Sequence, residues 1–395
     1  MQRPADSLTL PPIPAPAAAV HPARDRILAI LFCVAIAATG VAALKPRAQT
    51  TLELENRPIA AWPSLTLSHS FIAGFEAAFS DRFGGRGTLL RWHHALLVNT
   101  FHVSPAPNVM LGRDAWLYFL GEDGQSLDRN YRGTDVVGDG DITAVVAELA
   151  RRNRFLASLG IPYLVTIVPD KFTIYPEHLP GWVVRAAGQT PLDRLAQAIL
   201  SGTTLRFVDL RAALRAAKTR ERVYYATDSH WNLLGATVAY GEIMREVQRA
   251  LPPNRLPMIV PAELPEYVPG VDFYRGDLAR FIGYPPRVQE PDYAPLGKVL
   301  ANPASRCAQR VDSGVDIGYE FYVCNHPALP RAIVYRDSMA IPLIPLLSEN
   351  FSRVIYVSSH RFDRALIERE RPDVVIEEMV ERAMFAPAAS PMPHS

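Results

Sequence analysis

The sequence predicts an α/β fold in which a mostly parallel sheet lies between two layers of helices. From residue 141 onward, short and continuously apolar segments alternate with segments of helical periodicity. Strands that are apolar on both sides must be covered on both faces, as in parallel sheets flanked by helices. With 395 residues, the chain is long enough to bury one large core of this kind, alone or with accessory elements.

The expected elements follow from local patterns. Asp141 is expected to cap a first helix that Gly160 ends, and Asn232 to cap a long helix that runs through Leu251. A separate hairpin is expected over 109–119, with its turn at Gly112-Arg113-Asp114. The expected strands of the parallel sheet are the apolar segments 163–168, 205–208, 333–335, 354–357 and 374–376.

Residues 255–330 interrupt this alternation with Pro-rich, aromatic and irregular sequence, which we interpret as an insertion. Within it, Cys307 and Cys324 bracket the strand-like segment 316–323, preceded by a turn at Ser313-Gly314. A hairpin closed by one disulfide is expected here if the domain lies in an oxidising compartment, and the alternative is two unpaired buried thiols. His326 is the only additional ligand nearby, so no metal site is expected.

Residues 27–44 form one uncharged apolar segment with basic residues on both sides. The segment is long for a signal peptide and about right for a membrane-spanning helix, so an uncleaved transmembrane anchor is predicted over a cleaved signal. The numbers of basic residues on the two sides of the segment are nearly equal, so the positive-inside rule does not decide the orientation. The short front end favours a cytoplasmic tail over 1–26, with the folded domain on the other side of the membrane.

Composition and charge limit the function further. The chain has 41 Lys and Arg against 40 Asp and Glu, and this balance argues against a nucleic-acid-binding protein. The ends are rich in Pro and Ala, so disorder is expected over 1–26 and 386–395. Between them we expect a lead-in region over 45–105 and a catalytic domain over 106–385.

Two polar segments interrupt the regular elements, Thr227-Asp228-Ser229-His230-Trp231 and Tyr335-Arg336-Asp337-Ser338. Asp228 and His230 are spaced so that, in an extended loop, both side chains point the same way. Ser338 follows an apolar strand and precedes a helical pattern, where backbone N–H groups can bind an oxyanion. The three side chains are those of a Ser-His-Asp nucleophilic site, recognised by role rather than by order. The alternative is a helix N-terminus that Asp228 or Asn232 only caps, with His230 as a surface residue and Ser338 as a cap of its own helix.

The chain contains an ordered series of short polar and aromatic motifs between about 55 and 385. They are Glu55-Asn56-Arg57, Asp81-Arg82-Phe83-Gly84, Gly112-Arg113-Asp114, Pro169-Asp170-Lys171, Tyr175-Pro176-Glu177, Thr227-Asp228-Ser229-His230-Trp231-Asn232, Arg336-Asp337-Ser338, Pro372-Asp373 and Glu381-Arg382. This series resembles the AlgX/AlgJ-like family of polysaccharide O-acetyltransferases, whose fold is similar to the SGNH hydrolases. The resemblance implies a circularly permuted motif order, with Asp228 as orienter, His230 as base and Ser338 as nucleophile. At Asp170 this chain departs from the Asn that members of the family usually carry.

The resemblance implies an O-acetyltransferase anchored in the inner membrane with its domain in the periplasm. It would acetylate an exported polysaccharide through an acetyl-serine, without cofactor or metal, and receive acetyl groups from a membrane-bound O-acyltransferase partner. A carbohydrate acetylesterase with the same residues, and a non-catalytic component of an export complex, remain open as alternatives. Arg336, Lys171 and Trp231 are candidates for oxyanion or substrate contacts, with a structural role favoured for Lys171.

Overall fold

The described part of the chain falls into two units, residues 1–90 and 91–395, which are treated separately. Both the expected disulfide, Cys307 to Cys324, and the expected tail 386–395 lie outside the described residues. The computed structural model describes residues 22–43, 51–52, 57–65, 69–82, 86–121, 126–134, 137–185, 188–253, 276–283, 309–311, 319–323 and 327–385.

The first unit contains helix α1 (Pro22–Ala43), the two-stranded pair β1 (Thr51–Leu52) and β2 (Arg57–Pro58), helix α2 (His69–Arg82) and the start of α3 (Arg86–Leu96). Pro at the first helical position favours a helix start, so residues 22–26 are helical and do not belong to the expected disordered tail. Among the described residues, no helix combines the length and the apolarity that a membrane span requires. The anchor predicted over 27–44 is not confirmed and stays a prediction.

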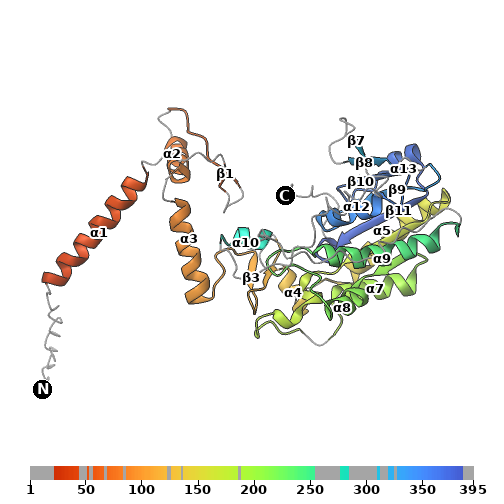
Figure 1. Ribbon diagram of the computed structural model, residues 1–395, viewed down its shortest axis with the longest axis horizontal. Coiled ribbons are helices and arrows are strands. Elements are labelled where there is room, and N and C mark those ends of the chain that lie inside the picture. The colour runs from red at the N-terminus through yellow and green to blue at the C-terminus, as the bar shows by residue number, and fades with distance from the viewer. Residues whose placement is uncertain are drawn as a thin grey trace, which may run out of the picture. The chain divides into compact units, whose positions relative to one another are not determined.

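The second unit is built on a seven-stranded sheet in the order β6-β5-β11-β9-β10-β8-β7. Figure 1 labels the strands β7, β8, β10, β9 and β11 of this sheet. The first five strands in this order pair in parallel, and the last two pair antiparallel. Every strand expected from the apolar segments is present, and a mostly parallel sheet is confirmed. The bounds are β5 (Tyr163–Val168), β6 (Arg206–Asp209), β7 (Gln309–Val311), β8 (Tyr319–Val323), β9 (Arg331–Tyr335), β10 (Arg353–Val357) and β11 (Val374–Val380).

Helices cover both faces of this sheet and give it the expected three layers. One hydrophobic cluster holds Val334 of β9 with residues of α8, α9 and α12, while the next residue, Tyr335, belongs to a second cluster with α5, α7 and α13. Successive side chains of a strand point to opposite faces, so both faces of β9 are buried. The helices are α5 (Asp139–Ser158), α7 (Pro191–Gly202), α8 (Arg211–Lys218), α9 (Leu233–Ala250), α12 (Ile344–Ser348) and α13 (Arg364–Glu370).

Shorter elements surround the ends of the sheet. The expected hairpin is present as β3 (Val109–Leu111) and β4 (Leu117–Phe119). Helix α10 (Asp277–Phe281) packs on this hairpin through a third cluster that contains Leu278, Val109 and Leu117. The remaining elements are η1 (Leu97–Phe101), α4 (Ser126–Arg132), α6 (Lys171–Ile174), η2 (Pro176–His178), η4 (Ser338–Leu343) and η5 (Glu381–Ala383).

The structure corrects two details of the expected elements. Helix α5 begins after Gly138, and Asp141 acts from the third helical position by accepting a hydrogen bond from the Gly138 N–H at 2.9 Å. The strand-like segment near Cys324 is β8, which pairs with both β7 and β10. Through this pairing, β7 and β8 extend the main sheet at the β10 edge.

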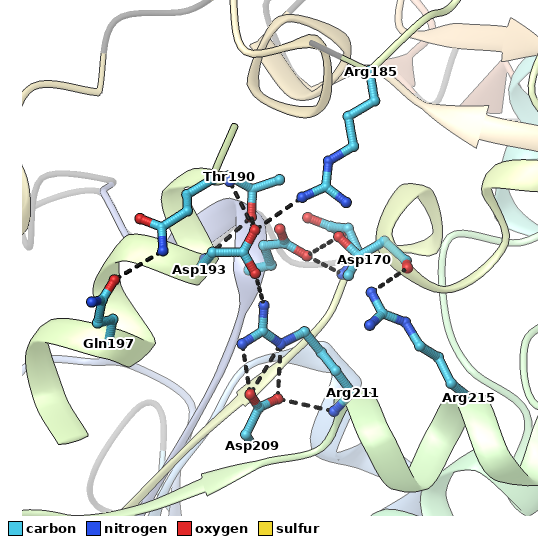
Figure 2. A network of polar contacts seen from close by, with 11 residues as sticks. Asp170, Arg185, Thr190, Asp193, Gln197, Asp209, Arg211 and Arg215 are labelled. Carbon is cyan, nitrogen blue, oxygen red and sulfur yellow. Dashed lines mark hydrogen bonds and ion pairs between the residues drawn. The ribbon is translucent and has the colours of Figure 1, made fainter. Parts of the chain in front are cut away.

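A network of charged side chains holds α7 and α8 at the β6 edge of the sheet (Figure 2). Arg211 forms ion pairs with Asp209, at the end of β6, and with Asp193 of α7. Arg185 also contacts Asp193, at 3.0 Å, and Arg215 donates to the carbonyl of Thr173 at 3.2 Å. These contacts connect β6 and both helices to α6 (Lys171–Ile174), the short helix that follows β5.

Candidate active site

The turn after β9 places Ser338 at the carboxyl edge of the parallel strands, as the first residue of η4. Asp337 caps this short helix, because its Oδ1 accepts the Met339 N–H at 2.8 Å. Its Oδ2 accepts the Val380 N–H at 2.6 Å, at the end of the neighbouring strand β11. Asp337 therefore ties the nucleophile turn to the sheet.

The segment 223–232 forms a tight loop before α9. Tyr224 and Trp231 pair in an antiparallel bridge, and the Asn232 N–H donates to the Val223 carbonyl at 3.1 Å. The Asn232 side chain caps α9 by accepting the Gly235 N–H at 3.0 Å, as expected. A β-carbon at Gly235 would lie 2.3 Å from the Val223 carbonyl oxygen, so only glycine lets the helix approach this loop so closely.

The structure brings Asp228, His230 and Ser338 into one hydrogen-bonded chain. His230 Nδ1 lies 2.6 Å from Asp228 Oδ1, and His230 Nε2 lies 2.9 Å from Ser338 Oγ. The Asp228 side chain is 2% exposed and that of His230 is 28% exposed, so the orienting acid is buried while the imidazole still reaches solvent. This is the arrangement in which an imidazole accepts the proton of a serine nucleophile.

The protonation states suit this arrangement. Burial would raise the pKa of Asp228, but the hydrogen bond and charge of His230, together with backbone N–H donors, hold it well below its usual range. Burial alone would lower the pKa of His230, but the hydrogen bond and charge of Asp228, with a contribution from Asp277, raise it above its ordinary value. Asp228 therefore stays ionised and stabilises the imidazolium form of His230.

Asp277 belongs to this site, although no sequence pattern marked it as a candidate. It is the first residue of α10, and its backbone N–H donates to Asp228 Oδ2 at 2.8 Å. Its carboxylate accepts the Ser229 N–H at 2.7 Å and the Ser229 hydroxyl at 2.5 Å. It lies within 255–330, where the sequence has no regular periodicity, and the one local signal is a Gly-Asp pair before a short apolar segment.

Lys171 and Trp231, two candidates for oxyanion or substrate contacts, hold backbone carbonyls. The ammonium of Lys171 donates to the carbonyls of Leu117 and Ala226 at 2.7 and 3.1 Å. The indole N–H of Trp231 donates to the Met339 carbonyl at 2.8 Å and so joins the histidine loop to η4. These contacts favour structural roles for both residues.

Arg336, the third candidate, is a buried residue beside the nucleophile. Its Nη1 donates to the carbonyl of Asp337 at 3.3 Å. Burial, and then the charge of Asp337, raises the pKa of Glu378 well above its usual range. The positive charge of Arg336 acts in the opposite direction. Glu378 accepts the Asp337 N–H at 3.1 Å and so supports the nucleophile turn.

Asp170 forms an ion pair with Arg382 at 2.5 Å. The charge of Arg382 also acts on His230, whose pKa it lowers. The neighbouring Glu381 accepts the Asp170 N–H at 2.8 Å, and burial, then the charge of Asp170, raises its pKa to about 7. Asp170 and Arg382 thus form a charge pair near enough to His230 for the arginine to act on its pKa.

Asp228, His230 and Asp277 each place one atom that can bind a metal within 4.8 Å of the other two. The Asp228 atoms already accept hydrogen bonds from His230 and Asp277, and the Asp277 carboxylate accepts both donors of Ser229. An ion would have to displace the proton on His230 Nδ1 that fixes the tautomer. We therefore assign this cluster to hydrogen bonding.

Comparison with known proteins gives a consistent result. The profile of the family described as "SGNH hydrolase-like domain, acetyltransferase AlgX" matches residues 109–311, which is just over half of the 395-residue chain. The matched segment contains Asp228, His230 and Asp277 and ends before Ser338.

Two related sequences carry the name "Probable alginate O-acetylase AlgJ". The protein from Pseudomonas syringae pv. tomato is 26% identical over 301 residues, which cover 71% of this chain and 70% of that protein. The protein from Pseudomonas aeruginosa is 30% identical over 265 residues, which cover 64% of this chain and 60% of that protein.

Among solved structures, the O-acetyltransferase domain of Pseudomonas putida AlgJ aligns with a TM-score of 0.45 at 21% identity, over 71% of this chain and 93% of that domain. The family match covers the hairpin, the parallel strands β5 and β6, and the histidine loop. The chain belongs to the family of SGNH hydrolase-like domains described by the acetyltransferase AlgX.

Proposed function

We propose that this protein is an O-acetyltransferase that transfers acetyl groups to hydroxyls of an exported polysaccharide through an acetyl-Ser338 intermediate. The observation that carries the proposal is the continuous hydrogen-bonded chain from Asp228 through His230 to Ser338. The related proteins carry the name "Probable alginate O-acetylase AlgJ", which favours acetyl as the transferred group and a polysaccharide as the acceptor.

In the first half-reaction, His230 Nε2 takes the proton of Ser338 Oγ as the oxygen attacks the acetyl carbonyl of the donor. The tetrahedral intermediate collapses, and the leaving group departs with the proton that His230 returns. In the second half-reaction, His230 takes the proton of an acceptor hydroxyl, whose oxygen attacks the acetyl-serine. Ser338 then leaves with that proton, and the acceptor carries the acetyl ester.

The oxyanion must be stabilised by donors on the nucleophile turn or beside it. The Met339 N–H already donates to Asp337 in the cap of η4, so its use in an oxyanion hole would require this cap to open. Arg336 is a second donor beside the turn, with Nη1 at 3.3 Å from the Asp337 carbonyl. Arg336→Gln is a direct probe of its contribution to turnover.

An acceptor oligosaccharide separates transfer from hydrolysis. The purified protein is incubated with an acetyl ester, with and without an acidic oligosaccharide. A transferase produces acetylated sugar at the expense of free acetate, whereas release of acetate alone, unchanged by the sugar, would contradict the proposal and identify an esterase. Ser338→Ala provides the background rate for both products.

The proposal includes the location of the protein. The uncharged apolar segment 27–44 motivates an inner-membrane anchor with the domain in the periplasm. Acetyl-CoA is cytoplasmic, so a membrane-bound O-acyltransferase partner would deliver the acetyl group. Reporter fusions after residue 60 are expected to be active in a periplasmic assay and silent in a cytoplasmic one. The reverse pattern would remove the need for such a partner.

Turnover is expected to rise with pH through the titration of His230. Only the neutral imidazole can accept the Ser338 proton, and Asp228 raises the pKa of His230 above its ordinary value despite burial. The acid limb of kcat/KM for a small acetyl ester should therefore have its midpoint above about 6.5, the pKa of an unperturbed histidine. A midpoint well below this value would contradict the assignment of His230 as the base.

A further inference from the structure

The carboxylate of Asp277 lies on the same side of the imidazole as the orienting acid. Asp277 Oδ2 is 3.6 Å from His230 Nδ1, against 2.6 Å for Asp228 Oδ1. The Ser229 hydroxyl contacts both Asp277 Oδ2, at 2.5 Å, and His230 Nδ1, at 3.3 Å. His230 therefore faces two carboxylates, one in direct contact and one partly bridged by a hydroxyl.

The backbone around Asp277 fixes this position. The Asp277 N–H donates to Asp228 Oδ2 at 2.8 Å, and the Ala279 N–H donates to the Thr227 carbonyl at 3.1 Å. A β-carbon at Gly276 would lie 2.1 Å from that carbonyl oxygen. The start of α10 is thus pressed directly onto the loop that carries Asp228 and His230.

From these contacts we infer that Asp277 is a second positioning residue for His230, which holds the 227–230 loop and supplies a second negative charge to the imidazolium. Its backbone N–H donates to Asp228 Oδ2, whereas His230 contacts Asp228 Oδ1. Its carboxylate fixes Ser229 and stabilises the charged ring from 3.6 Å. An opposite charge within 4–6 Å typically raises the pKa of a histidine.

The other charged groups that face His230 act with or against Asp277. Asp228 lies in the same loop and raises the pKa of the imidazole, whereas Arg382 of η5 lowers it. Arg382 is itself balanced by Asp170, Asp337 and Asp277. Removing the charge of Asp277 should therefore leave Asp228 alone to oppose Arg382, and the pKa of His230 should fall.

Ring titration by NMR tests this inference without turnover. The protein is labelled with 13C-histidine, and the His230 signal is identified by its loss in His230→Gln. Asp277→Asn should lower the midpoint of the His230 titration by about one unit, the low end of the shift that a nearby opposite charge produces. Asp277→Glu keeps the charge and should restore most of the midpoint.

Two further variants separate charge from structure. Ser229→Ala removes the bridging hydroxyl but keeps the carboxylate, so it should shift the midpoint far less than Asp277→Asn. Asp363→Asn is the matched control, because Asp363 also lies at the start of a short helix but accepts the Leu366 N–H instead of a donor in the 227–230 loop. If Asp277→Asn proves unfolded by circular dichroism, Asp277→Ser removes the charge from the same helix start.

The outcomes are distinct. An unchanged His230 midpoint in Asp277→Asn, or an equal shift in Ser229→Ala, would overturn the inference. The inference rests on the proposed function only in giving His230 the role of base. Because the titration is read from the ring itself, a shifted midpoint in a protein that forms no acetyl-serine would reject the proposed function and leave the role of Asp277 in place.

Discussion

Ser338→Ala is expected to reduce turnover of a small acetyl ester by about 10⁴-fold or more, to the level that binding and oxyanion contacts alone sustain. The reason is that Ser338 Oγ is the atom 2.9 Å from the base, and alanine leaves no nucleophile in its place. Initial rates of the purified variant measure the effect. Ser352→Ala is the control, because its hydroxyl donates to the Pro330 carbonyl at the opposite edge of the sheet, and it should keep wild-type activity.

The other two members of the chain should behave as parts of one unit. His230→Ala should lose nearly as much activity as Ser338→Ala, and the double variant should lose no more than either alone. Asp228→Asn should be severe but less complete, because it disturbs the tautomer of His230 while the nucleophile remains. If the double variant lost activity by the product of the two single-variant factors, Ser338 and His230 would act independently.

Arg152→Met is expected to destabilise the protein by about 3–5 kcal/mol, the usual cost of removing one partner of a buried ion pair. Arg152 Nη1 contacts both carboxylate oxygens of Glu377 at 2.7 and 2.9 Å, and the Glu377 side chain is fully buried. Burial would raise the pKa of Glu377, but hydrogen bonds and positive charge, including that of Arg152, lower it. Without Arg152, a buried carboxylate loses its main cation. Equilibrium unfolding in urea measures the loss.

The neighbouring arginine supplies the control for this prediction. Arg151 pairs with Glu148 on the exposed side of α5, and its side chain is 46% exposed. Arg151→Met should cost less than about 1 kcal/mol, as exposed ion pairs do. The double variant Arg152→Met with Glu377→Met should recover part of the lost stability, because the uncompensated charge is then removed. Equal costs for the two arginine variants would show that the buried pair contributes no more than a surface pair.

The sequence predicted the sheet well because its signal is local. Each parallel strand is a short apolar segment that needs cover on both faces, and β5, β9 and β10 appear where this pattern places them. The place of β8 in the sheet could not be predicted in this way. Its pairing with β10 depends on which strand lies at the edge of the parallel part of the sheet, and that is decided by the whole fold.

The same contrast between local patterns and tertiary contacts applies to the residues of the candidate site. Asp228 and His230 share one loop, and Ser338 follows a strong strand, so each is visible as a polar interruption of a regular pattern. Asp277 was missed because its role comes from tertiary contacts, namely the close approach of Gly276 to Thr227 and the N–H donated to Asp228. The hydrogen bonds of Lys171 and Trp231 to backbone carbonyls were equally invisible, since a basic or aromatic residue near a site has the same sequence signal in either role.

Trapping the acyl-enzyme tests the central claim most directly. The protein is mixed with an acetyl ester in the absence of acceptor, quenched in acid and digested for mass spectrometry. We predict one acetyl group on the peptide that contains Ser338, lost on addition of an acceptor sugar and absent from His230→Ala. Acetylated sugar formed with no acetyl group on Ser338 at any time, or equal formation by folded Ser338→Ala, would contradict the account.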